Sequence, residues 1–225
     1  MNVEDAIKSR KSIRAFKSTK VPRKKIEEVL KLAQRAPSGT NTQPWYVHVC
    51  TGKICKLISK EVLELMQNGA GYPYQDFDYY PKHWNEVHKA RRRGVGWALY
   101  GLLGIKKGDR EASQKQSARN FTFFDAPVGL FFTTDKYLGR GSWADVGLYM
   151  QTVMIAARGF GLDTCPQAAW IPYQEPVLRL LKIPDSQVLV SGMSMGYANH
   201  DAIENTLISD REELANVARF IGFDD

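Results

Sequence analysis

The stretch SWADVGLYMQTVMIAARGFGL, residues 142–162, decides the fold. It is long enough for several helical turns, and its apolar residues lie on nearly every side instead of along one stripe. A helix of this kind has little surface suited to water, so other elements must enclose it. The stretch therefore predicts a central helix around which the rest of the chain packs.

The neighbouring segments supply helices and strands to pack around this centre. VEDAIKSR near the N-terminus and RKKIEEVLKLAQRA, residues 23–36, have the three-to-four apolar spacing of amphipathic helices. WYVHVC (45–50) alternates like a strand, APVGLFFTTD (126–135) has the pattern of a buried strand, and VLVSGMSMGYA (188–198) closes the sheet. The pattern predicts an α+β sandwich in which all 225 residues form one domain.

Residues 69–120 differ in composition and are expected to form an insertion. GAGYPYQDFDYYPKHW (69–84) is too rich in Gly, Pro and aromatic residues for regular structure, whereas KARRRGVGWALYGLLGI (89–105) resumes a helical pattern. Flat aromatic faces suit a lid or a helical region lining a substrate pocket. A helix pair at a dimer contact fits the same residues.

Charge and cysteine content narrow the class of protein. The net charge of +7 is compatible with nucleic acid, with an anionic cofactor and with an anionic substrate. The three cysteines lack the spacing of a disulfide framework or a zinc site, which indicates buried thiols and no bound metal. No run of eighteen apolar residues occurs, and MNVEDAIKSRKSIR is charged where a signal peptide is apolar. We therefore expect a cytoplasmic protein that is not bound to a membrane.

A cluster of cations follows the first predicted helix. Arg10, Lys11, Ser12 and Arg14 bring three positive charges and a hydroxyl into five residues. Guanidinium groups bind phosphate oxygens through paired, charge-assisted hydrogen bonds. The cluster suits a phosphate, but a solvated basic helix end has the same appearance.

Two further segments are rich in small residues. In APSGTNTQPW (36–45) the small side chains allow the backbone to approach a flat ring closely, although an ordinary turn with Trp45 as a core anchor is the alternative. In TCPQAA (164–169) Pro166 donates no hydrogen bond, and the following residues offer successive N–H groups with little bulk. Both segments are candidates for contact with the edge of a ring.

Together, four segments resemble the FMN-dependent nitroreductase family. They are SRKSIRAF (9–16), APSGTNTQPW (36–45), GLDTCPQAAW (161–170) and GMSMGYA (192–198), followed by Arg211, and their order and spacing match over nearly the whole chain. The insertion, with RNFTFFDAPVGLFF (119–132), resembles the branch that includes nitrobenzoate reductases. The resemblance implies a nitroreductase-like α/β sandwich with a central mixed, mainly antiparallel sheet flanked by helices, in an obligate homodimer.

The resemblance also implies an activity. FMN would be bound, and hydride from NADPH or NADH would pass through flavin N5 to a nitroaromatic or quinone-like acceptor by a ping-pong mechanism. A related flavoprotein that performs reductive dehalogenation or dehydrogenation is one alternative. A basic nucleic-acid-binding module that uses KARRR (89–93) is another, although the leading interpretation includes no nucleic acid.

The resemblance assigns roles to single residues. Arg10, Ser12 and Arg211 would take the FMN phosphate with Lys11 nearby, Arg14 would face N1 and O2 of the flavin, and the Ala168 N–H would point at N5. The loop at 36–45 would reach the flavin held mainly by the other subunit, which makes the sites composite. Asp145 would contact the ribityl or ring region, or else cap its helix. The cofactor-binding set is Arg10, Lys11, Ser12, Arg14, Pro37, Ser38, Gly39, Asn41, Asp145, Pro166, Gln167, Ala168, Ala169 and Arg211, and the substrate-binding set is Tyr72, Trp97 and Phe124.

Overall fold

Four antiparallel strands form the sheet, and the sequence predicts three of them, with β3 as the exception. The computed structural model describes residues 1–71 and 79–223. The strand order is β1-β2-β4-β3, so β2 and β4 are central and β3 is an edge strand. Within the described ranges, a single bridge between Ser12 and Thr164 is the parallel pairing outside these strands. The bounds are β1 Tyr46–Thr51, β2 Val128–Asp135, β3 Asp163–Gln167 and β4 Gln187–Gly196.

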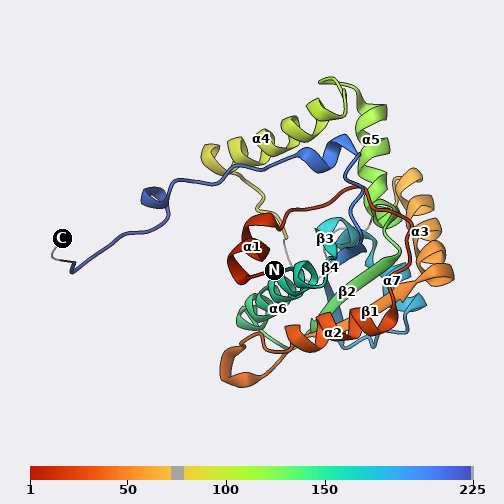
Figure 1. The fold of residues 1–225 in the computed structure, drawn as a ribbon. Coiled ribbons are helices and arrows are strands. Elements are labelled where there is room, and N and C mark those ends of the chain that lie inside the picture. Colours follow the sequence, from red (N-terminus) through yellow and green to blue (C-terminus); the bar gives the residue numbers. More distant parts are fainter. Residues whose placement is uncertain (72–78, 224–225) are drawn as a thin grey trace.

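The predicted central helix is α6, Arg140–Gly159, and it covers one face of the sheet (Figure 1). It contacts β2 and β3, and it is flanked by α1, Val3–Ser9, and α2, Arg23–Ala33. Alternate residues of β2 enter this core. One side of α6 stays open in the single chain, where Leu148 is 47% exposed.

The other face of the sheet is covered by α3, Gly52–Gln67, and α7, Gln174–Leu180, with two 3-10 segments. These are η2, Arg119–Asp125, and η3, Ala168–Tyr173. Trp170 is completely buried here and packs edge-on against Phe121 and Phe131. Sheet and helices thus form the sandwich expected from the sequence.

The insertion contributes two helices beside the sandwich (Figure 1). They are α4, Glu86–Leu102, and α5, Arg110–Ala118. Neither helix contains a buried residue. Helices are therefore present in this segment, whereas its role as a lid or pocket lining stays a prediction, and α5 with its separation from α4 was not anticipated.

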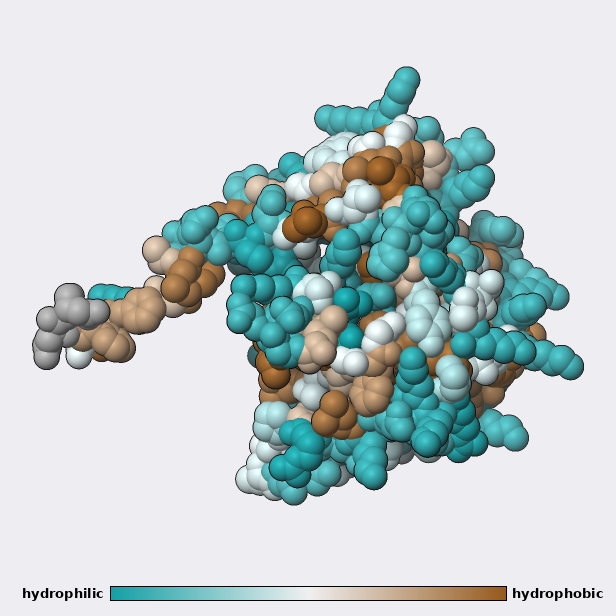
Figure 2. Space-filling model, in the orientation of Figure 1, coloured by the Kyte–Doolittle hydropathy of each residue, from teal (hydrophilic) through white to brown (hydrophobic). Residues whose placement is uncertain are grey.

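The segment after β4 leaves the body of the molecule. It forms the short turns η4, Ile203–Thr206, and η5, Leu214–Asn216, and then projects outward (Figure 1). Brown, apolar residues lie along this projection in Figure 2. Its exposed large apolar residues are Ile208, Leu214, Val217, Phe220, Ile221 and Phe223. No helix within residues 1–71 or 79–223 is long and apolar enough to cross a bilayer.

The close contact between β4 and Trp170 yields a stability prediction. A Cβ added at Gly192 would lie 2.3 Å from Trp170 Cδ1, and the indole is fully buried. Gly192→Ala should therefore lower the free energy of unfolding by about 1–3 kcal/mol, because the packed core must shift. The matched control is Gly94→Ala in α4, where the new methyl meets no atom within 4 Å. Denaturant unfolding that gave both variants the same stability would contradict this account of the core.

Candidate functional site

The basic segment 10–14 lies against the edge strand of the sheet. It follows α1, and the Ile13 N–H donates to the Thr164 carbonyl at 3.1 Å. The neighbouring Ser12 forms the parallel bridge to the same residue of β3. The predicted phosphate segment and the predicted ring-contact segment 164–169 are thus brought side by side.

Arg10 and Arg211 come together from opposite ends of the chain. The pKa of Arg10 is lowered, first because burial disfavours its charge and second because the positive charge of Arg211 is close. Arg211 donates to the Ser209 carbonyl and hydroxyl at 3.0 and 2.8 Å. Among residues 1–71 and 79–223, neither guanidinium forms an ion pair with a carboxylate. Two cations without a counter-charge are a donor set suited to phosphate.

The other residues of the cluster surround Cys165. Burial raises the pKa of the Cys165 thiol to about 11, although Arg14, Ser12 and Arg10 act in the opposite direction. The thiol is therefore neutral near pH 7 and poorly suited to act as a nucleophile. All three cysteines are buried free thiols, as the sequence predicted.

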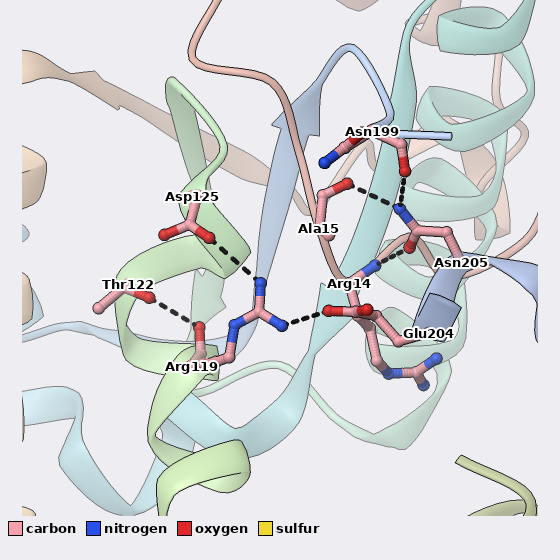
Figure 3. A network of polar contacts seen from close by, with 8 residues as sticks. All are labelled: Arg14, Ala15, Arg119, Thr122, Asp125, Asn199, Glu204 and Asn205. Carbon is pink, nitrogen blue, oxygen red and sulfur yellow. Dashed lines mark hydrogen bonds and ion pairs between the residues drawn. The ribbon is translucent and has the colours of Figure 1, made fainter. Parts of the chain in front are cut away.

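The buried side chain of Asn205, which the sequence did not predict, holds the basic segment 10–14 in place (Figure 3). The Arg14 N–H donates to Asn205 Oδ1 at 2.7 Å, and Lys11 Nζ donates to the Asn205 carbonyl at 2.6 Å. Next to it, the buried Glu204 pairs with Arg119 from the end of the insertion. No motif marks these residues, because the partners lie 191 positions apart in the sequence.

The segment 166–169 presents main chain more than side chains. Gln167 is buried, its Oε1 accepts from Ser194 Oγ at 2.7 Å, and its Nε2 donates to the Asn120 carbonyl at 2.7 Å. Pro166, Ala168 and Ala169 are half-buried. The side chain of Gln167 is thus occupied within the core, which leaves the backbone groups that the sequence analysis singled out.

The loop 36–45 is held by α6. The Gly39 N–H donates to both carboxylate oxygens of Asp145, at 3.2 and 3.3 Å, and the Gln43 N–H donates to Ser38 Oγ at 2.9 Å. Positive φ angles occur at Thr40 and Asn41 in η1, Gly39–Asn41, and at Gln43. The loop is therefore an ordered turn with an exposed Asn41, preceded by the exposed Pro37.

Asp145 does not cap its helix, which corrects one of the two predicted roles. The helix begins at Arg140 with Gly139 as its N-cap, so Asp145 lies in the second turn. Its carboxylate is bound to the loop backbone, and we infer that it positions the loop.

The loop and the basic segment lie at opposite ends of α6. Asp145 binds the loop, whereas Arg158 donates to Ser9 Oγ at 3.2 Å and pairs with Asp163. Thirteen residues separate these two anchors on one helix, which corresponds to about 20 Å along its axis. Within one chain, Asn41 and Arg14 are therefore not neighbours.

The substrate residues have different surroundings. Trp97 is 48% exposed on α4, with Lys107 Nζ 5.8 Å from its ring. Phe124 is 2% exposed and packs beneath the basic segment with Ile13 and Phe16, so it offers no accessible ring face to a substrate. Tyr72 lies outside the described residues.

The charges of the insertion are partly neutralised. Arg91 pairs with Glu212 at 2.9 Å, and Arg92 lies 5.3 Å from the ring centres of Tyr80 and Trp84. In the described part of the chain, no three His, Cys, Asp or Glu side chains are grouped as they would be to hold a metal ion.

Comparison with known proteins places this geometry in a family. The model of the Nitroreductase family matches residues 7–197. The chain is 40% identical over 219 residues to the 4-nitrobenzoate reductase of Pseudomonas putida, covering 97% of this chain and 95% of that protein. It is 34% identical to the chloronitrobenzene nitroreductase of Comamonas testosteroni, covering 97% of this chain and 96% of that protein.

A solved structure agrees over the entire fold. The crystal structure of the FMN- and NADPH-dependent nitroreductase NfnB from sphigopyxis sp. strain HMH superposes with a TM-score of 0.95 at 35% identity, covering 99% of this chain and 100% of that chain. This chain belongs to the nitroreductase family.

Proposed function

We propose that this protein is an FMN-dependent oxidoreductase that takes hydride from NADPH or NADH and reduces nitroaromatic or quinone-like acceptors by a ping-pong mechanism. The proposal rests on the basic segment 10–14, which lies against β3, and on Arg10 and Arg211, which have no carboxylate partner in the described residues. The similar proteins named above are nitroaromatic reductases, and one is FMN- and NADPH-dependent. Relatives concerned with dehalogenation are more distant, at 22% identity.

The residues of this chain would hold the cofactor and tune it. FMN, when bound, supplies the hydride-transfer chemistry. Arg10, Ser12 and Arg211 would bind its phosphate, and Arg14 would stabilise negative charge at the ring. Residues 166–169 would line the ring with main chain. Because orientation and fixed charge do most of this work, no side-chain acid or base is assigned a catalytic role.

The acceptor would meet the insertion, which we propose as the element that selects substrates. We propose that Trp97, which is exposed on α4, contacts the acceptor. The acceptor itself is proposed only as a class, a flat and electron-poor aromatic. A cytoplasmic location also stays a proposal.

We further propose a homodimer with composite sites. In a single chain the loop at 36–45 and the segment 10–14 lie at opposite ends of α6, and both flank the same helix. A second copy of the chain, related by a two-fold axis, would cover the open side of α6. This arrangement would bring the loop of one chain to the arginines of the other. The exposed apolar side chains of the projection after residue 207 would pack against the same partner chain, because exposed apolar patches mark interaction surfaces.

The decisive experiment for the activity is spectroscopic. The purified protein reconstituted with FMN should be yellow and should bleach when NADPH or NADH is added without oxygen. Re-oxidation by 4-nitrobenzoate should then restore the colour. A protein that fails to retain FMN in equilibrium dialysis would contradict the proposed function.

Arg14 should control the electron affinity of the bound cofactor. Arg14→Ala should retain FMN through Arg10 and Arg211, yet lower its reduction potential, because a fixed positive charge near the ring is lost. Hydride uptake should become slower, because the activation barrier should rise by about 2–4 kcal/mol. Spectroelectrochemistry and stopped-flow reduction provide the two measurements. Arg23→Ala, at an exposed position on α2, is the control and should leave the potential unchanged.

The composite site can be tested with mixed dimers. Arg14→Ala and Asn41→Ala homodimers should each be impaired, since every site lacks one of the two groups. When equal amounts are refolded together, random pairing should restore about a quarter of all sites to the natural arrangement.

Differential tags on the two variants identify the hybrid dimers, and each variant refolded with itself is the control. Confirmed hybrids that show no gain in activity over the two parents would place Arg14 and Asn41 at the same chain's cofactor.

A further inference from the structure

Asn205 contacts the main chain at the end of the proposed cofactor segment 10–14 (Figure 3). Its Oδ1 accepts from the Arg14 N–H at 2.7 Å. Its Nδ2 donates to the carbonyls of Ala15 and Asn199, each at 2.8 Å. The residue is 4% exposed, so these bonds are not exchanged easily for bonds to water. One side chain thus determines the path of the backbone through Arg14 and Ala15.

The turn that carries Asn205 is itself anchored. Glu204, 6% exposed, pairs with Arg119, and Arg119 also pairs with Asp125 at 3.1 Å. Removing one member of a buried ion pair is costly, so this contact resists rearrangement. The amide of Asn205 is therefore presented from a turn fixed to the end of the insertion.

Arg14 has few other restraints. Within residues 1–71 and 79–223, its guanidinium has a single hydrogen bond, from NH1 to the Ser12 carbonyl at 3.3 Å. With so little support at the guanidinium, the surrounding protein fixes mainly the position of the Arg14 Cα and the direction of its Cα–Cβ bond. The hydrogen bond to Asn205 is therefore the contact best placed to orient the charge of Arg14.

We propose that Asn205 is a positioning residue that orients Arg14 toward the flavin ring without touching the cofactor. This inference rests on the proposed function, since it assumes that Arg14 acts on bound FMN. Its structural part concerns the protein alone, however, and can be measured without cofactor.

The first experiment measures hydrogen exchange at the Arg14 amide in the cofactor-free protein. Asn205→Ala should accelerate this exchange by about tenfold, because the buried acceptor is lost. The control is Thr206→Ala in the same turn, whose hydroxyl donates within the turn to the Ile203 carbonyl. Unchanged exchange at Arg14 in folded Asn205→Ala would overturn the proposal. If this variant does not fold, Asn205→Leu, which keeps a similar volume without an acceptor, replaces it in both experiments.

The second experiment measures the reduction potential of bound FMN in a double-mutant cycle. Asn205→Ala should lower the potential, and it should cause no further decrease when Arg14→Ala is already present. Asn205→Gln, which keeps an amide oxygen and an amide N–H and adds no charge, should recover part of the potential. Decreases that add fully, or an unaltered potential in folded Asn205→Ala with FMN bound, would overturn the positioning role. Failure of the natural protein to bind FMN would overturn the proposed function as well, whatever the exchange experiment gives.

Discussion

The packing of α6 on the sheet determines where each part of the proposed site lies. Val146, Val153 and Ala157 are completely buried along its length. Full burial of each valine contributes about 1.5–3 kcal/mol to the free energy of unfolding, so the helix is held tightly against the sheet. Since it is also a rigid rod, the loop bound at Asp145 and the segment bound near Arg158 are held a fixed distance apart. In the proposed composite site, a cofactor that contacts both would bind where two copies of the helix meet.

The arginines of this chain fall into two electrostatic groups. Arg158 and Arg119 are largely buried and are compensated by Asp163 and Glu204. Arg10 and Arg211 instead have no carboxylate partner in the described residues, and the pKa of Arg10 is lowered first by burial and second by the positive charge of Arg211. Cations that are paired with carboxylates stabilise the fold. Two neighbouring cations without a carboxylate partner repel each other, and a bound anion would reduce that repulsion. A bound phosphate would therefore stabilise the folded protein as well as anchor the cofactor.

The sequence predicted the elements whose pattern depends on burial along a continuous segment. The strand at 128–135 has no polar side chain in its first five residues because both of its faces are covered, and the helix at 140–159 is recognisable for a similar reason. The helix nevertheless keeps an exposed side at Leu148, which composition alone does not distinguish from a buried one. Strand β3 was missed because Pro166 argues against a strand, and the proline is tolerated there because β3 lies at the edge.

Site residues were predictable to the extent that they occur in local clusters. The cation cluster and the small-residue loop are contiguous in sequence, so their chemistry is visible there. The bond between Asn205 and Arg14 joins positions 191 apart, and the contact of Asp145 with Gly39 spans 106 positions. Neither follows from spacing, since the fold alone brings these residues together. Phe124 was assigned to the substrate site because the sequence does not distinguish an aromatic ring that lines a pocket from one that lies buried beneath the basic segment 10–14.

The proposed cofactor segment lies outside regular secondary structure, so a few specific contacts must replace a hydrogen-bonded ladder. Phe123, Phe124 and Asp125 all have positive φ, between 53° and 69°, without a glycine among them. Such a run costs free energy and persists only where surrounding contacts impose it. The two phenylalanines are buried, and the Phe124 carbonyl accepts the Phe16 N–H at 3.0 Å, just after Arg14. The strained turn at 123–125 and the Asn205 amide therefore hold neighbouring residues of the same short segment, at Phe16 and at Arg14.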